Sequence, residues 1–290
     1  SVEKDRRLAA TYAQATAGET GIQCFDAWVQ TLLAKGYLHN HARMWFASIW
    51  IFTLRLPWEL GADFFLRHLL DGDPASNTLA WRWVAGIHTK GRPYIARASN
   101  ISKFTNGQFC PTHQLSTDVR PVVENTEHLR RPLPPAKTAE EIEGEYLLLL
   151  TEDDMGIGDT LGHPPLATLG ALATQGRSPL CVGALPQAFA ADAMRNLCGA
   201  QCIIDQEPWA PAIISACATH QVKQVVTGYA PVGPVAAALG AAQADVQAAG
   251  IQIHQVRRPY DTAAWPYATK GFFAMKKAIP SLLEQLVAQD

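Results

Sequence analysis

The chain has 290 residues, of which 48% are hydrophobic and 17% charged, and its formal net charge is −2. This length suffices for two domains, and the composition is typical of a globular protein with a sizeable core. The near-neutral charge gives no electrostatic indication of nucleic-acid binding, so such a contact would need a local basic face. The longest apolar run, residues 45–52, is too short to span a bilayer and no signal peptide is evident, so we expect a cytoplasmic protein without a membrane partner.

Over residues 1–115, apolar side chains recur at intervals of three and four residues, which predicts packed helices. Gly36 is expected to end one of these helices, and Pro57 to open another in its first turn. Asp73 is expected to cap a third helix, with Pro74 in the first turn.

Residues 116–144 are rich in proline, glutamate and other polar residues, which predicts an extended linker. Over residues 145–290, short apolar runs alternate with alanine-rich helical stretches, such as residues 188–197 and 234–249. The expected strands are 146–150, 180–183, 201–204, 224–227 and 251–256. Such alternation predicts a parallel, Rossmann-like α/β sheet that is covered on both faces. The predicted fold class is therefore α + α/β, a helical domain followed by a parallel-sheet domain.

The α/β part has no complete GxGxxG or Walker loop, so we expect no dinucleotide or P-loop site there. The six cysteines form no CxxC pair and no cluster with zinc-ligand spacing. Cys198 and Cys202 are four residues apart, but reduced and buried thiols are the better interpretation for all six. We therefore expect no metal site.

Three segments of the helical part place polar groups among apolar ones. Residues 39–44 are most simply a helix start with a solvated basic face. Residues 71–83 place Asp73, Asn77 and Trp81 at i, i+4 and i+8, on one face of a helix. The two carboxylates that flank the glycine at position 72 could hold a cation, an arginine or the polar edge of a ring ligand. In the third segment, residues 56–65, Trp58 is most simply a core aromatic.

Several short motifs follow one another between residues 20 and 111. They are Gly36-Tyr37-Leu38-His39-Asn40, Arg43-Met44, Pro57-Trp58-Glu59-Leu60-Gly61, Asp71-Gly72-Asp73, Asn77, Trp81-Arg82-Trp83 and Tyr94-Ile95-Ala96-Arg97. In order and spacing this stretch resembles the carboxyl half of the flavin domain of DNA photolyases and cryptochromes. The resemblance implies a helical flavin-binding half-domain with FAD as its cofactor.

The resemblance also implies a role for each matched residue. The isoalloxazine ring of FAD would be surrounded by Asn40, Arg43, Asp71, Gly72, Asp73 and Asn77. Among these, Arg43 and Asp71 would form a buried charged pair at the pyrimidine edge of the ring, and Asn77 would face N5. Trp81 would be the indole beside the flavin, with Trp58 next along an electron-hopping chain; these two and Asn77 would be the catalytic residues.

A substrate wall is also implied by the resemblance. Met44 and Trp83 would form part of the apolar wall that receives a pyrimidine dimer flipped out of DNA.

The chain also departs from the family pattern in three ways. His41 and Ala42 occupy positions where photolyases usually have Arg and Leu, and the residue aligned with the outermost tryptophan falls near Asp5.

The third departure is the absence of the family's preceding helical half, which supplies a Ser/Thr-rich loop for the FAD phosphates. Within residues 1–111, the nearest candidate for such a loop is Thr105-Asn106-Gly107. We therefore expect the chain alone to bind FAD weakly or not at all, and to need the upstream half of the flavin domain, in cis or in trans.

The α/β part resembles the antenna domain of the same family, in Tyr146-Leu147-Leu148-Leu149-Leu150, Asp159-Thr160-Leu161, Ala249-Gly250-Ile251-Gln252-Ile253-His254 and Trp265-Pro266-Tyr267. In the family this domain precedes the flavin domain. The order here suggests a circular permutation, or a chain whose true beginning has been removed.

The resemblance implies a light-driven, FAD-dependent lyase that acts on DNA containing pyrimidine dimers. A cryptochrome-like blue-light photoreceptor without repair activity is one alternative, and a degenerate, non-catalytic relative is another. The sequence leaves open which lesion is repaired and whether an antenna pigment is bound.

Overall fold

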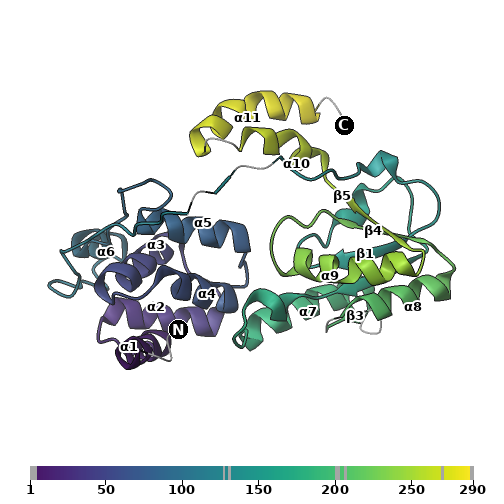
Figure 1. The fold of residues 1–290 in the computed structure, drawn as a ribbon. Helices are drawn as coiled ribbons and strands as arrows, with labels where there is room; N and C mark the ends of the chain where they lie inside the picture. Colours follow the sequence, from purple (N-terminus) through teal and green to yellow (C-terminus); the bar gives the residue numbers. More distant parts are fainter. Residues whose placement is uncertain are drawn as a thin grey trace. The chain divides into compact units, whose positions relative to one another are not determined.

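The computed structural model describes residues 5–126, 128–129, 132–199, 203–205, 208–268 and 271–287 (Figure 1). Its helices and a five-stranded parallel sheet confirm the predicted α + α/β fold class. By internal contacts the chain divides into two compact units. The helical unit contains Ser1–Arg130 and Thr174–Phe189, and the α/β unit contains Arg131–Ala173 and Ala190–Asp290. The domain boundaries expected at residues 115 and 145 stay predictions.

Six α-helices form the first part of the helical unit and cluster together in Figure 1. They are α1 (Arg6–Ala17), α2 (Gln23–Lys35), α3 (Asn40–Ser48), α4 (Trp58–His68), α5 (Pro74–Ala85) and α6 (Ala98–Phe104). The expected helix signals are present: Gly36 ends α2 with a φ of 62°, and Pro57 directly precedes α4. Asp73 caps α5 by accepting a hydrogen bond from the backbone N–H of Ser76 at 2.6 Å.

Aromatic side chains fill the core of the helical unit. Phe46, Trp50 and Phe64 are each at most 2% exposed, and their rings stack on one another. Trp50 lies in a π-helical turn, Ile49–Thr53, which continues α3. A Cβ added at Gly61 would collide with the Trp81 ring and come within 3.0 Å of Trp50. Glycine at this position therefore allows both indoles to pack against α4.

The sheet of the α/β unit has the strand order β3-β2-β1-β4-β5, with all strands parallel. The strands are β1 (Leu147–Thr151), β2 (Ala167–Ala171), β3 (Ile203–Ile204), β4 (Gln224–Gly228) and β5 (Gln252–Val256). Along β1, Leu147 and Leu149 belong to one buried cluster, and Leu148 and Leu150 to another. Because side chains alternate between the faces of a strand, both faces of the sheet are covered, as predicted.

The remaining α-helices are α7 (Ala184–Cys198), α8 (Ala210–His220), α9 (Pro234–Ala248), α10 (Pro259–Ala264) and α11 (Phe272–Val287). Helix α9 starts at the predicted residue, and α7 spans the predicted helical stretch 188–197. Among the described residues, no helix is both long enough and apolar enough to cross a bilayer.

The strand expected at residues 180–183 is wrong. This stretch is an irregular segment between a 3-10 turn, Thr174–Arg177, and α7. It belongs to the helical unit, where the backbone N–H of Gly183 donates to the carbonyl of Arg67 at 2.9 Å. The second strand is β2 instead, whose sequence ATLGA is too weakly apolar to stand out. In the stretch 201–204, Gln201 and Cys202 lie outside the described residues.

The first part of the expected linker packs on the helical unit. Val119 and Val122 contact its core, and the backbone N–H of Val122 donates to the carbonyl of Ala85 at 3.0 Å. The expectation that all thiols are buried is wrong for Cys110 and Cys181, which are exposed because both lie in loops. Within the described part of the chain, no group of acidic, histidine or cysteine side chains could hold a metal ion.

Candidate functional site

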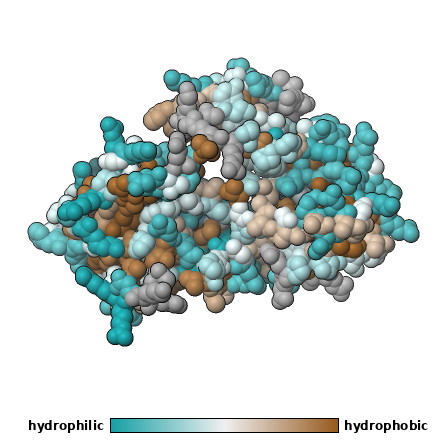
Figure 2. Space-filling view, viewed as in Figure 1, coloured by the Kyte–Doolittle hydropathy of each residue, from teal (hydrophilic) through white to brown (hydrophobic). Residues whose placement is uncertain are grey.

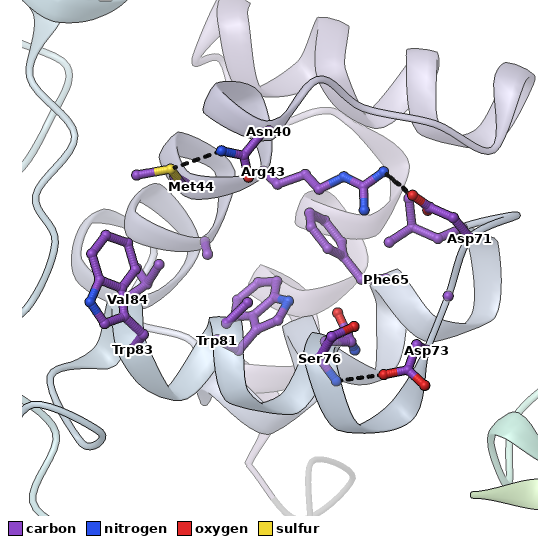
Figure 3. Close-up of a pocket in the computed structure, with 15 residues that line it drawn as sticks. Asn40, Arg43, Met44, Phe65, Asp71, Asp73, Ser76, Trp81, Trp83 and Val84 are labelled. Atoms are coloured by element: carbon purple, nitrogen blue, oxygen red, sulfur yellow. Dashed lines mark hydrogen bonds and ion pairs between the residues drawn. The ribbon is translucent and has the colours of Figure 1, made fainter. Parts of the chain in front are cut away.

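A cavity of about 420 Å³ opens among α3, α4 and α5 of the helical unit (Figure 3). Its size falls in the range of small-molecule sites. Fifteen residues line it: Asn40, Arg43, Met44, Ala47, Phe65, Leu69, Asp71, Gly72, Asp73, Ser76, Asn77, Ala80, Trp81, Trp83 and Val84.

Nine of the ten site residues expected from the sequence line this single cavity. They are Asn40, Arg43, Met44, Asp71, Gly72, Asp73, Asn77, Trp81 and Trp83. Trp58 is the exception among the described residues that we singled out. The structure brings the nine together, while the role of each one stays a prediction.

Helix α5 contributes one wall of the cavity through its period of 3.6 residues. Asp73, Asn77 and Trp81 lie on the cavity side, as their spacing predicts. The side-chain N–H of Asn77 donates to the carbonyl of Ala62 at 2.8 Å, which anchors this amide to α4. The rotamer of Asn77 is thereby fixed at the edge of the cavity.

The polar end of the cavity is held by an ion pair between two elements. Nη2 of Arg43 donates to both carboxylate oxygens of Asp71, at 3.0 and 2.9 Å, and Nε donates to the carbonyl of Leu38 at 2.8 Å (Figure 3). The expectation that this pair is buried is wrong, because the two side chains are 25% and 56% exposed. The pair lies at the mouth of the cavity, so solvent weakens it. The helix start at 39–44 is thus no purely solvated basic face.

The apolar floor is built around Trp81, which is only 2% exposed. Its ring makes edge contacts with Phe65, at a centroid distance of 5.1 Å, and with Trp50, at 6.2 Å. Trp83 is 38% exposed and stacks on Tyr94 at 5.5 Å. The cavity therefore extends from the buried indole of Trp81 to the partly exposed indole of Trp83.

The turn at Gly72 is tightly enclosed. A Cβ at this position would lie 3.1 Å from the carbonyl oxygen of Leu69 and 3.2 Å from Nη1 of Arg177. That guanidinium donates to the Leu69 carbonyl at 2.9 Å, beyond the C-terminal end of α4. Arg177 thus fixes the turn that carries Asp71 into the cavity.

Sequence analysis did not identify several residues that line or support the cavity. The cavity residues Ser76, Ala80 and Val84 recur every four positions, a signal that could have added them to the wall formed by α5. Phe65 and Leu69 have the same spacing on and just after α4. No sequence signal identifies Arg177, because its role depends on a contact across more than a hundred residues.

Trp58 has a different environment from Trp81. The guanidinium of Arg82 lies 5.7 Å from the centroid of the Trp58 ring and forms a two-bond ion pair with Glu124. Hydrogen bonding by Arg82 lowers the pKa of Glu124 to about 2. Trp58 is therefore partly covered by a cation that the linker segment holds in place.

The donors and acceptors around the cavity fit a flat, mostly apolar ring with a polar edge. Phe65 and Trp81 offer apolar surface, while Arg43 and Asn77 can meet ring carbonyls and nitrogens. The cavity does not suit a pyrophosphate, because Asp73 occupies the N-terminus of α5 with its own carboxylate. The Thr105 hydroxyl donates to the carbonyl of Ile101, and Thr105-Asn106-Gly107 lies outside the cavity lining.

Comparison with known proteins finds similar sequences for the helical part of the chain. Residues 2–113 match the family described as the FAD binding domain of DNA photolyase. The chain is 33% identical over 140 residues to the deoxyribodipyrimidine photo-lyase of Alkalihalophilus pseudofirmus, which is 47% of this chain and 28% of that protein. It is 47% identical over 77 residues to the enzyme of the same name from Streptomyces griseus, or 27% of this chain and 17% of that protein.

A third relative is the deoxyribodipyrimidine photo-lyase of Escherichia coli, which is 38% identical over 78 residues, or 27% of this chain and 16% of that protein. The matched stretch thus spans less than a third of each of these relatives. Residues 2–113 of this chain are therefore similar to the FAD binding domain of DNA photolyases, and FAD is the cofactor of that matched domain.

Proposed function

We propose that this chain is part of a photolyase-like FAD flavoprotein, a lyase that uses blue light to split pyrimidine dimers in DNA. The observation that carries the proposal is the convergence of nine expected residues on one cavity in the segment that matches the FAD binding domain. When bound, FAD supplies the photochemical electron transfer.

The protein's own groups would bind and orient the ring in that cavity. Arg43 and Asp71 would hold its polar edge from α3 and from the turn before α5. Asn77, anchored on α4, would present its amide to the ring centre. Trp81 would exclude water from one face, because its indole is almost fully buried.

The exposed part of the cavity would receive the substrate. Met44 and Trp83 both line it, and Figure 3 shows them beside each other at the end away from Asp71. Apolar, stackable side chains of this kind suit an extruded base pair. We therefore assign DNA containing pyrimidine dimers as the partner, with Met44 and Trp83 as its wall.

A second half of the flavin domain, supplied in cis or in trans, completes this proposal. The cavity lacks groups suited to a pyrophosphate, and apolar residues stand exposed nearby, among them Leu79 at 53% and Trp83 at 38%. On the face seen in Figure 2, apolar surface also gathers over the helical unit. Helices that carry a phosphate-binding loop would cover such a surface.

Flavin titration tests this arrangement. We expect the 290-residue chain alone to bind FAD weakly, and the chain mixed with the upstream half of a relative's flavin domain to become yellow and more heat-stable together. A ligand that binds only the folded state stabilises it, so the two effects are linked. Tight, stoichiometric binding by the chain alone would show instead that the site is complete.

One observation favours the second candidate, a cryptochrome-like photoreceptor without repair activity. His41 replaces the usual arginine, and its ring packs against Trp45 at 5.5 Å and Phe104 at 4.9 Å. An imidazole held among rings is a poorer partner for a DNA phosphate than a guanidinium. Blue-light splitting of the pyrimidine dimer in an oligonucleotide by the yellow complex separates the two functions: restored pyrimidines support repair, and a photoreducible flavin without dimer splitting supports signalling. A colourless complex would indicate a degenerate relative.

We also propose that the α/β unit is an antenna-like domain in permuted order. Its support is the parallel sheet with strand order β3-β2-β1-β4-β5 together with the motifs quoted above. A pigment that absorbs outside the flavin bands, co-purifies with the chain and is lost when residues 190–290 of the α/β unit are removed would support this assignment. A pigment that stays with the helical unit would contradict it.

A further inference from the structure

The turn that carries Asp71 into the cavity is held from two sides. On one side, the backbone N–H of Leu70 donates to the carbonyl of Gly36, just after α2, at 2.9 Å. On the other side, Nη1 of Arg177 donates to the carbonyl of Leu69 at 2.9 Å. The two hydrogen bonds fix successive residues of the turn, so both support the position of the Asp71 carboxylate.

The guanidinium of Arg177 also lies against the far side of the turn. A Cβ added at Gly72, directly after Asp71, would lie 3.2 Å from Nη1 of this arginine. The positive charge complements the partial negative charge at the carboxyl end of α4. Leu69 itself is only 2% exposed, and Leu70 keeps its own hydrogen bond. Loss of the guanidinium would therefore loosen Asp71 and Gly72 without releasing the two residues before them.

The segment Thr174–Phe189, which supplies this guanidinium, belongs to the helical unit and is anchored on α4. The hydroxyl of Ser178 donates to Oδ1 of Asp63 at 2.6 Å, and the backbone N–H of Gly183 donates to the carbonyl of Arg67 at 2.9 Å. Nε of Arg67 donates to Oδ2 of Asp63 at 2.8 Å and so joins the two anchor points. The segment thus presents its guanidinium from a fixed backbone.

We infer that Arg177 is a positioning residue of the flavin site, which acts on the ring through the turn that carries Asp71. This inference rests on the proposed function, because Asp71 must meet the flavin ring for its position to matter. Arg177 lies outside residues 2–113, the segment that matches the FAD binding domain. The flavin site of this chain thus extends beyond the matched segment.

The effect of Arg177 would reach the ring through the ion pair at the mouth of the cavity. Asp71 accepts two hydrogen bonds from Nη2 of Arg43, whose Nε donates to the carbonyl of Leu38. When Asp71 moves, Arg43 retains only the bond to Leu38, and the polar edge of the ring loses a fixed donor and a fixed acceptor together. Arg177 does not line the cavity, so its removal should weaken flavin binding less than removal of the Asp71 carboxylate.

A double-mutant cycle on flavin affinity tests this inference. It uses the full chain, with the upstream half of a relative's flavin domain added where the chain alone holds no flavin. Titration with FAD, followed by flavin fluorescence, gives the Kd of the parent, Arg177→Gln, Asp71→Ala and the double variant. We expect Arg177→Gln to weaken binding by about three- to tenfold in the parent and by less than about twofold in the Asp71→Ala background. A residue that only stabilises the fold would weaken binding equally in both backgrounds.

Two further variants sharpen the cycle. Arg55→Gln is the matched control, because Nη2 of Arg55 donates at 2.8 Å to a distant backbone carbonyl of the same unit, that of Asp118, away from the cavity lining. It should change the Kd for FAD by less than about twofold. Arg177→Lys keeps the charge but not the planar fork, so its Kd should fall between those of the parent and Arg177→Gln. Thermal unfolding checks that each variant is folded, and Arg177→Lys replaces Arg177→Gln in the cycle if the latter is not.

The outcomes separate this inference from the proposed function. An unchanged Kd in Arg177→Gln, an equal loss in both backgrounds, or an equal loss in Arg55→Gln overturns the role of Arg177. Flavin bound by the parent leaves the proposed function intact in each of these cases. A parent that holds no flavin, even with the upstream half, contradicts the proposed function and the inference with it.

Discussion

The cavity of the helical unit and the carboxyl edge of the sheet in the α/β unit contain the same kinds of groups in different arrangements. In the helical unit, Arg43 and Asp71 pair at the mouth of a cavity of about 420 Å³. At the sheet edge, Arg258 donates to both carboxylate oxygens of Asp154, at 2.8 and 2.6 Å. A Cβ added at Gly228 would lie only 2.9 Å from the Cβ of Asp154.

The two pairs differ in the space that they leave for a ligand. In an open parallel sheet the strand order reverses here between β1 and β4, and their carboxyl ends are the usual place for a ligand. Yet Asp154, just after β1, packs onto Gly228 at the end of β4 and is held by Arg258 and the backbone N–H of Gly156. An arginine–carboxylate pair marks a binding site only where it borders open space.

The largest effect expected from this comparison concerns two helical glycines. Gly61→Ala should destabilise the helical unit by about 1–3 kcal/mol, because the new methyl group collides with Trp81. Gly240→Ala, in α9, should stabilise the α/β unit by about 0.5–1 kcal/mol, because nothing lies within 4 Å of its Cβ position. Urea unfolding followed by tryptophan fluorescence and circular dichroism measures both, and a Gly61→Ala variant as stable as the parent would contradict the tight packing described for Trp81.

Removal of each carboxylate gives the next largest effect. Asp71→Ala should weaken flavin binding by about tenfold or more, since a charged hydrogen-bond partner is typically worth about 1.5–3 kcal/mol. It should lower the free energy of unfolding by no more than about 1 kcal/mol, because both side chains of the pair are partly exposed to solvent. Asp154→Ala is the control: it should destabilise the α/β unit and leave the flavin affinity unchanged. Equal flavin stoichiometry and affinity in Asp71→Ala and the parent would remove Asp71 from the site.

A smaller effect concerns pH and the helical unit alone. Burial, assisted by the nearby Arg67, lowers the pKa of His68 to about 4 from an ordinary value of 6.5. Between these values the unfolded chain takes up the proton first, so stability should fall as pH decreases from about 6.5 to about 4 and be constant above that window. The slope from this group is at most about 1.4 kcal/mol per pH unit. His68→Gln should flatten the curve of melting temperature against pH, and an unchanged curve would show that His68 does not titrate as described.

The smallest effect is a difference in thiol reactivity. Cys110 and Cys181 are exposed and should react with a thiol reagent at once. Cys24 in the helical unit and Cys217 in the α/β unit are buried, and burial raises the pKa of both, that of Cys24 to about 11. Without the upstream half we expect Cys24 to become labelled before Cys217, as mass spectrometry would show. The reverse order would mean that the helical unit is the more stable one.

The success of sequence-based prediction differed between the two units for physical reasons. Around the cavity, each wall comes from a short local pattern, such as Asp73, Asn77 and Trp81 on one helix, so the residues could be named before their positions were known. The sheet was less predictable, because β2 has few large apolar residues and the apolar stretch at 180–183 packs on α4 rather than beside β1. Arg177 was missed because its hydrogen bond to the carbonyl of Leu69 joins residues that are 108 positions apart.

The contacts made by Thr174–Phe189 bear on the order in which this protein can fold. Arg177 and Ser178 bond to Leu69 and Asp63, which precede them by 108 and 115 residues. Closing so long a loop costs entropy before the contact is gained, so the turn that presents Asp71 is completed late. On the ribosome, the helical unit cannot complete this turn until β1 and β2 of the other unit have been synthesised. A fragment that stops at the linker would fold with the carboxyl end of α4 uncapped, which makes the position of a truncation as important to flavin binding as any residue in the cavity.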